Sequence, residues 1–105
     1  MFGDLFGNLE GQQKALREEL KKKKIVVSEA QGRITIEANA AREVLNVRID
    51  DSLLSPDKRE ELEDHLIIAL NTLMVKASEA ETSQMQDKLQ SMMPGFGDLL
   101  KGFKP

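Results

Sequence analysis

The feature that most constrains the fold is a strand that leads through a short turn into an unusually long helix. Apolar and polar residues alternate over residues 44–50, which predicts a half-buried β-strand. Ser55 and Pro56 then suit the N-cap and the first position of a helix. No Pro or Gly follows until Pro94, so this helix can run for roughly 35 residues, or about 52 Å. A chain of 105 residues cannot cover such a helix with its own core, and we therefore expect a second copy or another partner.

Three shorter segments precede this unit. Apolar residues recur at spacings of four and seven between residues 5 and 22, which predicts a first helix with a narrow apolar stripe. Two short runs of alternating or β-branched residues, 25–27 and 33–38, predict a hairpin. The loop at residues 39–43 leads to the third strand, and Asn39 is expected to supply its left-handed conformation.

These segments predict an α+β fold of order α-β-β-β-α, with a three-stranded antiparallel sheet and two long projecting helices. We expect one domain over residues 1–92 and a flexible C-terminal tail over residues 93–105. The long helix offers an apolar face to the sheet as far as Ala77, but residues 78–91 are mostly polar. This second half should overhang the sheet and pair with the first helix or with a dimer mate, because an isolated polar helix is marginal in water.

Charge is distributed unevenly along the chain, whose net charge is −3. Residues 14–33 hold seven cations and three anions, a local charge of +4, whereas residues 50–64 hold two cations and seven anions, a local charge of −5. Exposed charges are screened over about 8 Å, so the two regions can act separately. A polyanion would have to bind the first region while the acidic region faces solvent.

The cationic region is the one feature that points to a ligand. Each Lys or Arg that meets a phosphate releases counterions, which gives affinity without sequence preference. The candidate DNA contacts are Lys14, Arg17, Lys21, Lys22, Lys23 and Lys24, with Arg42 as a weaker candidate. The plain alternative is that lysines near a helix C-terminus complement its dipole and stay solvated. The four Phe all lie in terminal segments and Tyr and Trp are absent, which disfavours base stacking on single strands or RNA.

The sequence shows no set of residues that is typical of catalysis or metal binding. The chain has no Cys and a single His, and the acidic residues 57–64 suit the solvated start of a helix. We therefore expect no enzyme activity, no cofactor, no metal site and no small-molecule substrate. No apolar run approaches the roughly 20 residues of a membrane span, and we expect no membrane contact and a cytoplasmic location.

Several short motifs, in order and spacing, resemble the YbaB/EbfC family of nucleoid-associated proteins. They are Met1-Phe2-Gly3, Gly7-Asn8-Leu9, Gly32-Arg33-Ile34-Thr35-Ile36, residues 47–54, the acidic helix start at residues 57–64, Ala69-Leu70-Asn71 and Met93-Pro94-Gly95-Phe96. One departure is the turn at residues 39–43, where the family commonly has a Gly. The resemblance implies a homodimer with helices that project as arms, and binding to double-stranded DNA in the nucleoid.

The sequence thus predicts a homodimeric nucleoid-associated protein that binds duplex DNA with little sequence preference and organises the bacterial chromosome or modulates gene expression. The alternative is a protein-interaction scaffold that uses its overhanging helices and apolar termini and binds no DNA. The acidic net charge and the absence of base-reading residues favour the second reading.

Overall fold

The computed structural model describes residues 2–92, and its side chains from Leu9 to Ser91. The predicted tail at residues 93–105 lies outside the described residues. The elements are helix α1 (Phe2–Lys21), strands β1 (Lys24–Glu29), β2 (Ile34–Asn39) and β3 (Val44–Ile49), two 3₁₀ turns, η1 (Asp51–Leu53) and η2 (Pro56–Lys58), and helix α2 (Arg59–Met92). The predicted α+β order is confirmed, including the length of the last helix, which has 34 residues.

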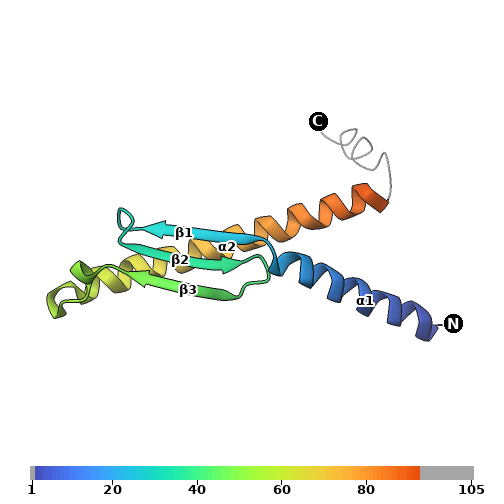
Figure 1. Cartoon of the computed structure of the whole chain (residues 1–105), viewed down its shortest axis with the longest axis horizontal. Helices are drawn as coiled ribbons and strands as arrows, with labels where there is room; N and C mark the ends of the chain where they lie inside the picture. Colours follow the sequence, from blue (N-terminus) through green and yellow to red (C-terminus); the bar gives the residue numbers. More distant parts are fainter. Residues whose placement is uncertain (1, 93–105) are drawn as a thin grey trace.

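The sheet is a simple antiparallel meander of order β1-β2-β3. Val27 of β1 pairs with Ile36 of β2, which in turn pairs with Val47 of β3, so these three side chains share one face. Helix α2 lies across this face (Figure 1). The core between them includes fully buried Ile34 and Ile36 from the sheet and Ala69 and Leu73 from α2.

Helix α2 covers β1 and β2 but leaves β3 open. Val27 is 1% exposed, whereas Val47, two strands away on the same face, is 47% exposed. Within one chain, β3 is therefore more exposed than the half-buried strand predicted for residues 44–50, although the strand itself is present. The pairing also shifts between Glu37 and Ala38, so that β3 has one extra residue, Leu45, and a β-bulge.

The turn between β2 and β3 is built differently from the prediction. Arg42, not Asn39, takes the left-handed conformation, with a φ of 66°. Asn39 is buried and holds the turn through its side chain, because its Oδ1 accepts hydrogen bonds from the N–H groups of Ala41 (3.0 Å) and Glu43 (3.1 Å). An amide side chain that bonds its own downstream backbone replaces the Gly expected here.

Both helices project past the same end of the sheet (Figure 1). A hydrogen bond joins the two helices, because Gln84 Nε2 of α2 donates to Glu19 Oε2 of α1 at 2.6 Å. Helix α2 begins at Arg59, after the 3₁₀ turn that Ser55 and Pro56 open. Ser55 occupies the N-cap position of that turn but makes no side-chain capping bond to its backbone. The predicted overhang is present, and it faces α1 across a groove.

Candidate nucleic-acid interface

The predicted cations gather where α1 ends and the sheet begins. Lys14 and Arg17 are exposed on α1, and Lys22 and Lys23 occupy the turn that joins α1 to β1. The residue that follows β2 fixes the backbone of this turn: the N–H of Ala40 donates to the carbonyls of Leu20 (3.1 Å) and Lys23 (3.0 Å). The turn therefore presents its lysines from a fixed backbone.

Three of the seven candidates lie within ion-pair distance of carboxylates. Lys21 lies 3.4 Å from Glu18, Lys24 lies 3.7 Å from Glu37, and Arg42 pairs with Glu81 of α2. Lys24 belongs to β1, so it lies beyond the first helix, which the sequence predicted to end at residue 22. The helix closes at Lys21, beyond which the N–H of Lys23 bonds the carbonyl of Leu20.

The remaining four candidates form the arm cations: Lys14, Arg17, Lys22 and Lys23. None of them has a carboxylate oxygen within 4.0 Å among the described residues. Lys23 is half-buried and the other three are exposed. An exposed lysine or arginine without a partner can meet a phosphate without first breaking an ion pair, so these four are the better candidates for contact.

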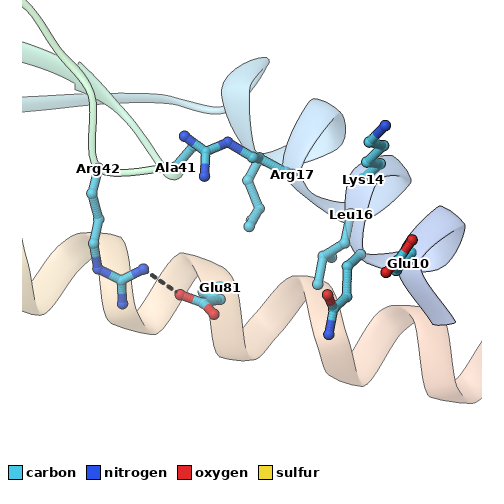
Figure 2. Close-up of a pocket in the computed structure, with 9 residues that line it drawn as sticks. Glu10, Lys14, Leu16, Arg17, Ala41, Arg42 and Glu81 are labelled. Atoms are coloured by element: carbon cyan, nitrogen blue, oxygen red, sulfur yellow. Dashed lines mark hydrogen bonds and ion pairs between the residues drawn. The ribbon is translucent and has the colours of Figure 1, made fainter. Parts of the chain in front are cut away.

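Between the two arms lies an open cleft of roughly 500 Å³ (Figure 2). Leu16 points toward α2, whereas Lys14 points away from it, and Arg42 reaches down from the β2–β3 turn to Glu81. Arg42 thus ties this turn to α2. This ion pair is consistent with the prediction that Arg42 is the weaker candidate for a DNA contact, because the guanidinium already has a carboxylate partner within the chain.

The acidic region lies at the other end of the sheet, where α2 begins (Figure 1). The guanidinium of Arg33 donates to Glu61 Oε1 at 3.0 Å, and this bond lowers the pKa of the Glu61 carboxyl. The N–H of Ser52 donates to Asp50 and lowers the pKa of that carboxyl in the same way. Both groups therefore stay ionised, and the two charged regions are separated by the length of the strands.

One cation that the sequence reasoning missed also lies between the arms. Lys88 of α2 is half-buried beside Leu9 and Gln12 of α1. Asp87 precedes it in the sequence and offsets its charge, so charge counting gave no signal. Only the proximity of the two helices in space places Lys88 opposite α1.

The described part of the chain has neither a helix that could span a membrane nor a group of side chains that could bind a metal ion. Neither α1 nor α2 is long and apolar enough there to cross a membrane. Among the side chains from Leu9 to Ser91, no three His, Asp or Glu come together in a group that could hold a metal ion.

The sequence matches the YbaB/EbfC DNA-binding family over residues 2–93. The chain belongs to this family. Curated relatives are named nucleoid-associated proteins: one of Nitrobacter winogradskyi is 37% identical over 84 residues, which is 80% of this chain and 76% of that protein. One from Nitrobacter hamburgensis is 35% identical over 89 residues, 85% of this chain and 80% of the relative.

A solved structure shares the fold of this YbaB/EbfC member. The crystal structure of an uncharacterized protein from Helicobacter pylori superposes with a TM-score of 0.62 at 23% identity, covering 88% of this chain and 92% of that one. The resemblance found from the sequence motifs is thus confirmed by the family match, and the predicted fold has a solved counterpart.

Proposed function

We propose that the protein is a nucleoid-associated protein that binds duplex DNA as a homodimer, with little sequence preference and without catalysis. The observation that carries this proposal is the set of arm cations, Lys14, Arg17, Lys22 and Lys23, which have no acidic partner among the described side chains and lie far from the acidic start of α2. Such cations neutralise phosphates and do not read bases. Membership of a DNA-binding family supports the same ligand and a place in the cytoplasmic nucleoid.

The uncovered β3 supports the homodimer. His65 and Lys76 mark the β1 side of α2, because His65 Nδ1 lies 3.5 Å from Glu29 and Lys76 Nζ donates to the carbonyl of Val26. At 3.6 residues per turn, Leu70 and Met74 lie about 60–100° from the buried Leu73 in the opposite sense. They therefore face the β3 side, where they are 46% and 57% exposed.

We name the exposed apolar side chains of β3 and of this flank of α2 the β3 face: Val44, Val47, Ile67, Leu70 and Met74. All five are about half exposed or more. Such a surface suits a two-fold interface, in which both copies use the same patch, because the helix flank of one copy can cover the open strand of the other. A second copy is thus its proposed occupant, and the dimer doubles the number of arm cations.

Fluorescence anisotropy with labelled duplex DNA tests the ligand. The wild-type affinity should fall steeply with salt, with a log–log slope of about 0.9 per phosphate contact. The double variant Lys14→Glu/Arg17→Glu should bind more weakly and show a smaller slope. The matched control Arg48→Glu/Arg59→Glu carries the same charge change on β3 and at the start of α2, and should bind more tightly than the arm variant. Equal losses in both variants would argue for net charge alone.

The protein-interaction scaffold remains the second candidate, and exposed apolar side chains between the arms favour it. Leu9, Met85 and Leu89 are 40–48% exposed there. A scaffold would bind no duplex DNA at low salt, and its arm variant would behave as wild type. The same titration therefore separates the two functions.

A further inference from the structure

The distal part of the cleft between the arms is an apolar groove with no cover among the described residues. Leu9 and Leu16 of α1 face Met85 and Leu89 of α2 around a hollow of roughly 260 Å³. Leu9 is 47% and Met85 48% exposed. We name this site the interhelical groove; it is separate from the β3 face, which lies over the sheet.

The chain carries a segment that suits this groove. After Met92, where α2 ends, 13 residues follow. Phe96, Leu99, Leu100 and Phe103 recur at i, i+3, i+4 and i+7, the spacing that places side chains on one face of a helix. On the same helical wheel, Asp98, Lys101 and Lys104 fall outside that face. The apolar spacing of residues 96–103 is therefore that of a short amphipathic helix, although Gly97 and Gly102 lower its helix propensity in the absence of a docking surface.

Pro94-Gly95 separates this segment from α2. Pro cannot continue a helix and Gly allows left-handed backbone, so this pair favours a reversal of the chain. Leu89 lies one turn before the end of α2, and Met85 about 6 Å further back at 1.5 Å per residue. A helix over residues 96–103 would be about 12 Å long, which is enough to reach both side chains after a reversal.

We propose that residues 96–103 fold back and seat their apolar face in the interhelical groove of the same chain. Tethering favours this occupant over another protein, because a short linker gives a local concentration in the millimolar range. The docked segment would cover Leu9, Met85 and Leu89 and would join the ends of α1 and α2. This inference does not depend on DNA binding.

The composition of the chain allows a clean test, since it has no Trp and no Tyr. In the full-length variant Phe103→Trp, a docked segment should give blue-shifted emission and acrylamide quenching several-fold weaker than in a free peptide of residues 93–105 with the same Trp. Adding Met85→Ala/Leu89→Ala should restore the red-shifted emission and the strong quenching. Adding Ile68→Ala/Val75→Ala, which removes two apolar side chains of α2 that lie outside the groove and are at least as exposed as Met85 and Leu89, should leave the emission and the quenching unchanged.

Four results would overturn the proposal. They are red-shifted emission in Phe103→Trp itself, a blue shift that survives the groove variant, a blue shift that grows with protein concentration and so reports a second copy, and a blue shift that needs added anionic vesicles. Far-UV circular dichroism of each variant verifies that the arms are folded.

An engineered disulfide tests the docking independently. Because the chain has no Cys, two introduced cysteines can pair only with each other within one chain. In Met85→Cys/Leu99→Cys, glutathione buffers should favour an intramolecular disulfide far more than in the control Val75→Cys/Leu99→Cys. Equal disulfide formation in the two would contradict docking in the groove.

Discussion

Val27 and Val47 are the same residue type on the same face of the sheet, one on each side of Ile36. Val27 is 1% exposed beneath α2, and Val47 is 47% exposed beside it. The difference shows that a single helix layer covers only two of the three strands. The covered half stabilises the protomer, and the uncovered half is the surface on which we propose that a second copy packs.

The largest expected effect is a loss of folding when the covered valine, Val27, is replaced by a charged residue. Val27→Asp should abolish folding, because an unpaired carboxylate beneath α2 would cost several kcal/mol. Circular dichroism and thermal unfolding measure this loss. A cooperative unfolding transition close to that of the wild type would show that α2 does not seal this side of the sheet.

The same substitution on the uncovered strand β3 should weaken the dimer and leave the folding of the single chain intact. Val47→Asp should leave the protomer folded but convert the dimer to a monomer, because the carboxylate can stay hydrated in the free chain and not in the β3 face. Sedimentation velocity measures the change. Arg48→Asp, one residue further on the opposite face of the strand, is the control and should remain a dimer; a dimeric Val47→Asp would place the interface elsewhere.

An intermediate effect is expected at the turn that positions β3. Asn39→Ala removes the acceptor for the N–H groups of Ala41 and Glu43, and loss of a buried partner costs about 1–3 kcal/mol. Urea unfolding should show this loss of stability. Amide hydrogen exchange should rise more in β3 than in β1, and an equal rise in both strands would mean that the turn does not control β3 separately.

The smallest effect concerns the link between the β1–β2 hairpin and α2. Arg33 lowers the pKa of Glu61, whose ordinary value is 4.5, so ionised Glu61 stabilises the folded state above that value. This contribution should be lost as pH falls through the lowered pKa of the folded state. In Glu61→Gln, the melting temperature should therefore depend less on pH below about 4.5; an unchanged pH dependence would exclude this pair as a contributor.

Sequence periodicity predicted the elements well because it reports which side chains share a face. The alternation of apolar and polar residues predicted the strands of the sheet. The absence of Pro and Gly between Pro56 and Pro94 predicted the length of the last helix. Periodicity did not predict the exposure of β3 within one chain, because alternation shows that Val47 shares a face with Ile36 but not that α2 stops short of it. It also assigned the turn to Asn39 for its backbone, whereas the side chain of Asn39 holds the turn.

The candidate site was predicted in part for a similar reason. Counting charge along the chain located the cations but not their partners. Glu37 and Glu81 are 13 and 39 residues from Lys24 and Arg42, and only the fold brings them together. Which cations stay free for a ligand is therefore a property of the tertiary structure.

The central claim is that the uncovered β3 pairs two protomers and so doubles the cations that meet DNA. The slope of log affinity against log salt, measured for wild type and for Val47→Asp, tests it most directly, since this slope counts phosphate contacts. We expect the wild-type slope to be about twice that of the monomeric variant. Equal slopes, with Val47→Asp shown to be monomeric, would contradict the account.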